Sequence, residues 1–141
     1  MIYKLFLSQE VARKIAERAE ANAKTNGWSV SIAVVNESGQ LLFFTKMDNS
    51  TNSSGPIAIA KAEHAANFRR DTVFHQDLIQ SGNFLVLALP ASMPIEGGVQ
   101  LIYEGKTIGG IGVSGAPSEE DGAIAKAGAD FLSTYKLSQQ E

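Results

Sequence analysis

The first clear pattern in the sequence is an alanine-rich stripe near the N-terminus. Apolar residues recur there at spacings of three and four, and charged residues fill the positions between them. Ser8 suits the N-cap, Glu10 the first turn and Gly27 the C-terminal stop. The pattern predicts a helix over residues 9–26 that packs closely on a sheet or on another helix. The stripe consists of Ala12, Ile15, Ala16, Ala19 and Ala23.

Five short runs rich in β-branched and aromatic residues predict strands. Turn residues at 37–39 and 104–106 join four of these runs into two hairpins, of which the first is the clearest in the sequence. Pro90 ends the remaining run. The runs are 28–35, 41–47, 84–89, 99–103 and 107–113.

Residues 56–70 predict a second helix, with Pro56 at its first position. It carries two stripes. The first is made of small apolar residues and is expected to face the sheet, whereas the second mixes apolar and ionisable residues and indicates a subunit contact or a pocket wall. The first stripe holds Ala58, Ile59, Ala62, Ala65 and Ala66, and the second holds Ile57, Lys61, His64 and Phe68.

Two further stretches complete the predicted elements. Residues 71–80 are either a continuation of the second helix or a short extra helix, and a capping-box pattern at 118–121 opens a last helix through about Tyr135. Hairpins rather than helical crossovers join most neighbouring strands. We therefore predict one α/β (α+β) domain over residues 1–141, with a mainly antiparallel five-stranded sheet and helices packed on it.

The amino-acid composition excludes several kinds of chemistry and binding partner. The chain has 141 residues, a net charge of -3, two histidines and no cysteine, so disulfides, thiolate metal sites and a cysteine nucleophile are excluded. An excess of acidic residues argues against a nucleic-acid partner. The N-terminus lacks the pattern of a signal peptide, and no run approaches 18 apolar residues. The expectation is a cytoplasmic protein with no membrane partner.

The glycine-rich block at 110–115 matches two motifs found in enzymes, but the surrounding sequence lacks the residues that each motif requires. It reads G-x-G-x-x-G, but only about six residues follow the last predicted helix, so the second strand of a dinucleotide fold is missing. The nucleophile elbow G-x-S-x-G fails because its fifth position is Ala116 and no histidine follows residue 75. Two interpretations of Ser114 stay open, a backbone hydrogen bond and a ligand contact. The strand end and helix N-terminus together offer N–H groups to an anion.

The two histidines of the chain are candidate metal ligands. On one continuous helix, His64 and His75 would stand roughly 16 Å apart at about 1.5 Å per residue, too far to hold one metal ion. A single histidine can instead be an axial ligand to haem, whose iron also accepts Met or Tyr. The alternative is a packing or interface residue. The available Met and Tyr side chains are Met47, Met93, Tyr3 and Tyr103.

Three features can furnish a small-molecule pocket. Lys46-Met47-Asp48 stands at a strand end, Lys61 can balance a carboxylate or propionate, and Gly97-Gly98 permits close approach of a ligand. Each has a plainer alternative: Asp48 as a turn cap, Lys61 as a solvated charge and the glycines as a bulge.

Taken together, these residues resemble the GlcG/HbpS-like family, also called the haem-degrading or haem-binding domain family. The resemblance covers nearly the whole chain, and the block at 109–115 is its most specific part. His64 departs from the family, where Thr is frequent, and Lys46 stands where Arg is usual. The resemblance rests on the first helix, Ile32-Ala33-Val34-Val35, Gly39, Lys46-Met47-Asp48, Lys61-Ala62, Ala65, Phe68, Gly97-Gly98, Gly109–Gly115 and Asp121.

The resemblance implies a profilin-like sandwich with a five-stranded antiparallel sheet, and homo-oligomers from dimers to octamers. It also implies haem or corrinoid binding in some members, redox sensing or haem degradation in a few, and genes near those of glycolate, glycerol and propanediol catabolism.

The leading hypothesis is therefore an oligomeric haem or tetrapyrrole-binding protein, with His64 as axial ligand, Lys61 as a propionate partner and Phe68 as an apolar wall. The alternative is an enzyme or accessory protein acting on a small hydroxy acid, diol or aldehyde, with Asp48 as general base and the 112–115 backbone holding a carboxylate or oxyanion. A third reading is a structural subunit of a larger assembly. The full candidate binding set is Met47, Asp48, Lys61, His64, Phe68, Gly97, Gly98, Gly112, Ser114 and Gly115.

Overall fold

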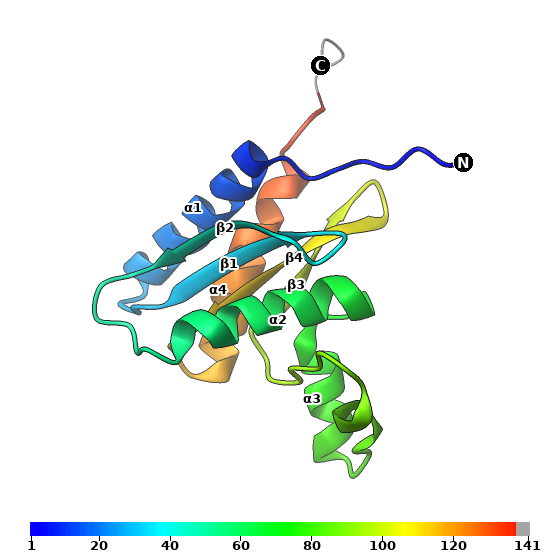
Figure 1. The fold of residues 1–141 in the computed structure, drawn as a ribbon. Helices are drawn as coiled ribbons and strands as arrows, with labels where there is room; N and C mark the ends of the chain where they lie inside the picture. The colour runs from blue at the N-terminus through cyan, green and yellow to red at the C-terminus, as the bar shows by residue number, and fades with distance from the viewer. Residues whose placement is uncertain (138–141) are drawn as a thin grey trace.

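The structure is a computed structural model that describes residues 1–137 (Figure 1). Its helices are α1 (Gln9–Thr25), α2 (Ser54–Phe68), α3 (Thr72–Gln80) and α4 (Ser118–Ala129), and its strands are β1 (Ser31–Asn36), β2 (Leu41–Lys46), β3 (Gly98–Tyr103) and β4 (Lys106–Ser114). Two 3-10 helices, η1 (Leu85–Ala88) and η2 (Asp130–Ser133), follow α3 and α4. No helix in the described residues has the length and apolar character needed to cross a membrane.

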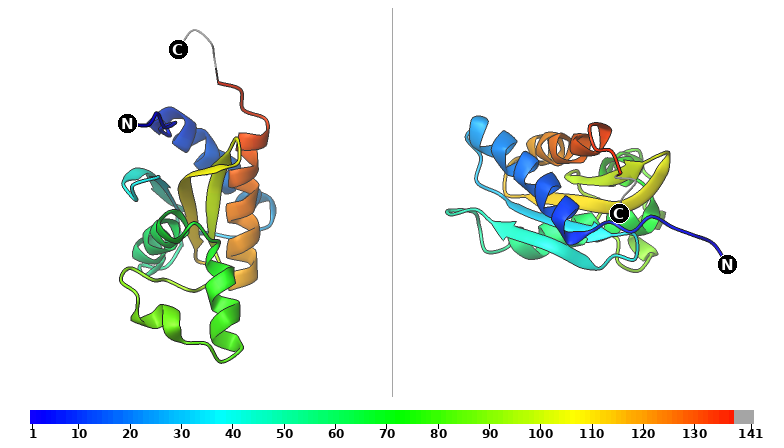
Figure 2. Two further views of the ribbon diagram at one scale, coloured as in Figure 1. Left: turned by 90° about the vertical axis from the view of Figure 1, so that its right-hand side faces the viewer. Right: turned by 90° about the horizontal axis from the view of Figure 1, so that it is seen from above.

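The four strands form one antiparallel sheet in the order β2-β1-β4-β3. Helices α1 and α4 cover one face and α2 covers the other (Figure 2). The α+β class and both hairpins are confirmed, but the prediction of five strands is wrong. Residues 84–89 lie outside the sheet, where η1 forms, because α3 carries the chain away from the strands before this apolar run begins (Figure 1).

The predicted first helix is confirmed as α1. Ser8 caps it, since its Oγ accepts a hydrogen bond from the Val11 amide at 3.2 Å. The alanine stripe is buried against β1, β2 and α4, and small side chains there allow the helix to approach the sheet closely. The same core takes in apolar residues from β1, β4 and α4, including Ile32, Ile111 and Ile124.

The glycine-rich strands allow α2 to approach the other face. Ala58 and Ala62 of α2 pack on Ala33 and Val35 of β1. A Cβ at Gly112 would collide with the carbonyl oxygen of Ala58, and a Cβ at Gly110 with that of Ala62. Gly98 of β3 meets the carbonyl oxygen of Lys61 in the same way. Glycine is therefore required at these positions by backbone-to-backbone contact between helix and sheet.

Helix α2 ends where Arg69 adopts the left-handed conformation at φ 52°, and Asp71 then begins α3 as its extended N-cap. Of the two interpretations of residues 71–80, the short extra helix is confirmed. The last predicted helix is shorter than expected, because α4 ends at Ala129 and continues only as the 3-10 helix η2. Its N-cap is Pro117, not a capping-box serine.

Candidate functional site

The chain reversal at Arg69 brings the two histidines into contact. Nε2 of His64 lies 2.9 Å from Nδ1 of His75, so the predicted separation of about 16 Å is wrong. The amide of Met93 donates to Nδ1 of His64 at 2.8 Å. Because that nitrogen accepts, Nε2 of neutral His64 carries the proton and donates to His75. His75 in turn carries its own proton on Nε2.

His64 is completely buried and therefore held in its neutral form. Burial, with a smaller contribution from His75, lowers the pKa of His64 from 6.5 to about 4. Both of its ring nitrogens are hydrogen-bonded, so neither is free to contact an iron in this arrangement.

His75 is the outer member of the pair and is only half-buried. Burial, and then the charge of Arg70, lowers its pKa as well. The ring centroid of Phe68 lies 4.5 Å from that of His64 and 5.4 Å from that of His75. Phe74 stands edge-on to His75 at 5.0 Å, and the Arg70 guanidinium lies 5.1 Å from the Phe74 ring centre. Within residues 1–137, the Nε2 edge of His75 makes no hydrogen bond.

A buried ion pair joins α2 to the start of α4. Nζ of Lys61 donates to Asp121 Oδ2 at 3.2 Å and to the Val113 carbonyl oxygen at 3.0 Å. Each residue is only 2% exposed. Burial lowers the pKa of Lys61 and raises that of Asp121, while each charge counteracts the effect on its partner. Lys61 therefore points into the protein and not into solvent, where a propionate would meet it.

The Asp121 carboxylate occupies the anion site that the sequence predicts where the glycine-rich strand β4 ends and α4 begins. Oδ1 of Asp121 accepts from the Ala116 amide at 2.9 Å, and the Gly115 amide also lowers the pKa of Asp121 by hydrogen bonding. The first turn of α4 carries Glu119 and Glu120 as well. The helix N-terminus is thus occupied by charges of the chain itself.

The predicted site residues fall into two groups in space. Met47 and Asp48 follow β2 at the end of the sheet where β4 also finishes, because Ser31 of β1 pairs with both Lys46 and Ser114. Met47 packs on the core and Asp48 is exposed on a turn. Lys61, Gly97 and Gly98 belong to the same sheet end, because Gly98 pairs with Gly112 and the Val113 backbone bonds to both Gly97 and Lys61. The sheet-end group is therefore Met47, Asp48, Lys61, Gly97, Gly98, Gly112, Ser114 and Gly115, and the second group is His64 and Phe68, which lie beside His75.

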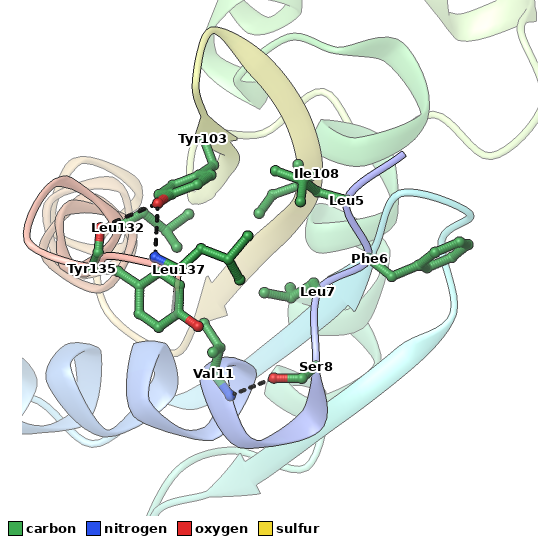
Figure 3. Close-up of a pocket in the computed structure, with 10 residues that line it drawn as sticks. All are labelled: Leu5, Phe6, Leu7, Ser8, Val11, Tyr103, Ile108, Leu132, Tyr135 and Leu137. Carbon is green, nitrogen blue, oxygen red and sulfur yellow. Dashed lines mark hydrogen bonds between the residues drawn. The ribbon is translucent and has the colours of Figure 1, made fainter. Parts of the chain in front are cut away.

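Three of the hollows in the described part of the chain, residues 1–137, lie elsewhere, and none of these three is lined by a residue of the candidate binding set. The first, of about 150 Å³, is apolar and lies between the N-terminal segment, the β3–β4 hairpin and the end of the last helix (Figure 3). In it the Tyr103 hydroxyl donates to the Tyr135 carbonyl at 3.4 Å and accepts from the Leu137 amide at 3.2 Å. The others, of about 480 and 890 Å³, are open grooves beside the same hairpin, and Tyr3 and Tyr103 line the larger.

The sequence analysis set His75 aside as a partner of His64 because it worked out their separation only for one continuous helix, although a short extra helix over residues 71–80 was left open. The signal was present in Asp71-Thr72, which is N-cap chemistry and marks the start of a new helix. Among residues 1–137, no group of three His, Cys, Asp or Glu side chains is arranged to hold a metal ion.

Comparison with known proteins agrees with this architecture. The family model described as "Haem degrading protein HbpS-like" matches residues 7–130. GlcG of Escherichia coli K12 is 36% identical over 111 residues, which cover 79% of this chain and 83% of GlcG.

Two solved structures share the fold at closely similar scores. A double mutant of Streptomyces reticuli HbpS superposes with a TM-score of 0.84 and 32% identity, over 94% of this chain and 90% of that one. The complex of PduOC with haem superposes with a TM-score of 0.81 and 26% identity, over 89% and 94%. This chain belongs to the HbpS-like family.

Proposed function

We propose that this protein binds haem or a related tetrapyrrole, with His75 as the ligand to its iron. The single observation that carries the proposal is the hydrogen-bonded histidine pair, in which a buried His64 holds a half-exposed His75 by its Nδ1 atom. The second nitrogen of an iron-ligating histidine is commonly fixed by a hydrogen-bond partner, to which it donates. In His75 that nitrogen is fixed as well, but as the acceptor. Membership of the HbpS-like family and the fold shared with the haem complex of PduOC support the proposal.

The residues around His75 suit a tetrapyrrole. Phe68 and Phe74 supply aromatic surface next to His75, and Arg70 supplies a cation for a propionate. His64 keeps its place in the proposed site as the positioning residue, whereas the exposed Arg70 takes the role first considered for Lys61. When bound, the iron supplies redox and oxygen chemistry to a chain that has no thiol of its own.

The direction of the hydrogen bond between His64 and His75 determines which nitrogen of His75 must lose a proton when iron binds. Because His64 donates to Nδ1 of His75, neutral His75 carries its proton on Nε2. Coordination through Nε2 would displace that proton and leave His75 as an imidazolate that accepts from His64, so iron binding should release one proton and strengthen as pH rises.

The second candidate is action on a small hydroxy acid, diol or aldehyde with Asp48 as base. It has less geometric support, because Asp48 is exposed and the Ala116 amide near the proposed oxyanion site is already bound to Asp121. Loss of turnover on such substrates in the Asp48→Asn variant would favour it. A cytoplasmic location remains a prediction from the sequence.

An absorbance titration of the apo protein with haem tests the leading proposal. We expect the wild type to give a shifted Soret band that His75→Ala abolishes. Tyr3→Phe is the matched control, because Tyr3 lines the 890 Å³ groove that is the alternative location. A spectrum unchanged in His75→Ala contradicts the proposal, and a spectrum lost in Tyr3→Phe moves the site to the groove. Circular dichroism confirms that each variant is folded.

A further inference from the structure

An apolar hollow that the proposed function does not use lies between the N-terminal segment and the core. Its walls come from the residues before α1, the first turn of α1, the β3–β4 hairpin and the chain after α4 (Figure 3). Leu7, Ile108 and Leu132 line it and are only 6%, 7% and 4% exposed, so its floor belongs to the core. None of the ten residues that line it is charged. An ionised ligand would lose its hydration there without gaining a partner.

The size of the hollow limits its ligand to a small molecule. Its volume is about 150 Å³. An apolar cavity of about this volume in another protein binds benzene. A single aromatic ring or a short branched chain therefore fits, whereas a tetrapyrrole is far too large. Leu5, Tyr103 and Ile108 line both this hollow and the 890 Å³ groove, so the groove leads to the hollow from solvent.

Two tyrosines bring hydroxyl groups to these apolar walls. Their ring centroids lie 5.9 Å apart. The Tyr103 hydroxyl is engaged, because it donates to the Tyr135 carbonyl and accepts from the Leu137 amide, and these bonds hold the chain after α4 in place as one wall. The Tyr135 hydroxyl, in contrast, makes no hydrogen bond with the other residues drawn around the hollow (Figure 3). It therefore has a donor and lone pairs to offer a ligand.

We propose that this hollow binds a small neutral molecule with an apolar body and one hydroxyl group, such as a phenol or a short alcohol. The apolar walls take the body of the ligand out of water, and the Tyr135 hydroxyl exchanges a hydrogen bond with the hydroxyl of the ligand. A carboxylate or an ammonium ion is disfavoured, because no residue that lines the hollow carries the opposite charge. This site goes beyond the proposed function and does not depend on it, because neither His64 nor His75 lines the hollow.

Titration of the full-length apo protein with phenol, toluene and benzoate, followed by amide chemical shifts in NMR spectra, tests the proposal. We expect phenol to give saturable shifts at Leu7 and Ile108, and benzoate to give none. Tyr135→Phe should weaken phenol binding about fivefold, the effect of one neutral hydrogen bond, and leave the Kd of toluene unchanged. Val11→Phe should abolish the shifts, because Val11 lines the hollow and a larger ring there fills it. Val73→Phe is the matched control, because Val73 is also half-buried on a helix but lies outside the hollow.

Three results overturn the proposal: no saturable shift with phenol in the wild type, an unchanged Kd for phenol in Val11→Phe, and a Kd for benzoate as low as that for phenol. Equal changes for phenol and toluene in Tyr135→Phe overturn the hydroxyl contact. Circular dichroism confirms that each variant is folded, and Tyr135→Phe alone decides the matter if Val11→Phe is not. Haem titration of the same variants is read separately, because a variant that loses phenol binding and keeps the Soret band supports this site whatever the outcome for His75.

Discussion

His64 donates a hydrogen bond from Nε2 to Nδ1 of His75 across 2.9 Å, although α2 ends and the chain reverses between them. The contact fixes the protonation of both rings and links α2 to α3. Through its other nitrogen, His64 also holds the Met93 amide, so the segment that carries η1 is tied to the same side chain.

Burial of His64 in the histidine pair makes the free energy of unfolding depend on pH. The pKa of His64 is about 4 in the folded protein and about 6.5 when unfolded, so the unfolded chain binds the extra proton first. The free energy of unfolding should be highest above pH 6.5, fall as pH drops toward 4 and then level off, by up to about 3 kcal/mol. Urea denaturation at several pH values measures this, and the His64→Gln variant should lose most of that slope. An equal slope in the variant contradicts the assignment.

The Lys61–Asp121 pair should be costly to break from one side. Lys61→Met leaves a buried carboxylate without its cation and should lower the free energy of unfolding by about 3–5 kcal/mol. Asp121→Asn keeps an acceptor for the Ala116 amide, so Lys61→Met/Asp121→Asn should recover part of the loss. Urea denaturation gives the coupling free energy of the double-mutant cycle. Additive effects would show that the two side chains do not depend on each other.

The glycine-rich block should be intolerant of a single methyl group where α2 approaches. Gly112→Ala places a Cβ against the Ala58 carbonyl and should destabilise the protein by about 3 kcal/mol. Gly105→Ala is the control, because nothing lies within 4 Å of that Cβ and only its positive φ is penalised, by about 1 kcal/mol. Thermal or urea unfolding compares the two. Equal losses would mean that helix contact is not what requires glycine.

Haem affinity should rise with pH. Coordination by Nε2 of His75 displaces a proton that His64 prevents from moving to Nδ1, so the apparent Kd should fall as pH increases from 6 to 8. Titrations in matched buffers, with proton release followed by a pH indicator, measure both quantities. In His64→Ala, Nδ1 is free to take the proton and the pH dependence should weaken.

Periodicity was sufficient for α1, for both hairpins and for the alanine side of α2 that faces the sheet, because Ala58 and Ala62 are separated by one helical turn. It was not sufficient for residues 84–89, whose apolar character serves an exposed surface and not a strand. Lys61 was predicted to be a propionate partner, or else a solvated charge, because its true partner, Asp121, is distant in sequence. The histidine contact depends on a single left-handed residue, Arg69, for which hydrophobic spacing carries no signal.

The most direct test of the proposed haem site is to replace the His75 side chain with free imidazole. His75→Gly is loaded with haem and its absorbance spectrum is recorded before and after free imidazole is added. We predict that the variant loses the wild-type Soret band and that imidazole restores it, because the added ring replaces the missing side chain beside Phe68 and Phe74. A wild-type spectrum in the variant without imidazole would show that the iron is held elsewhere.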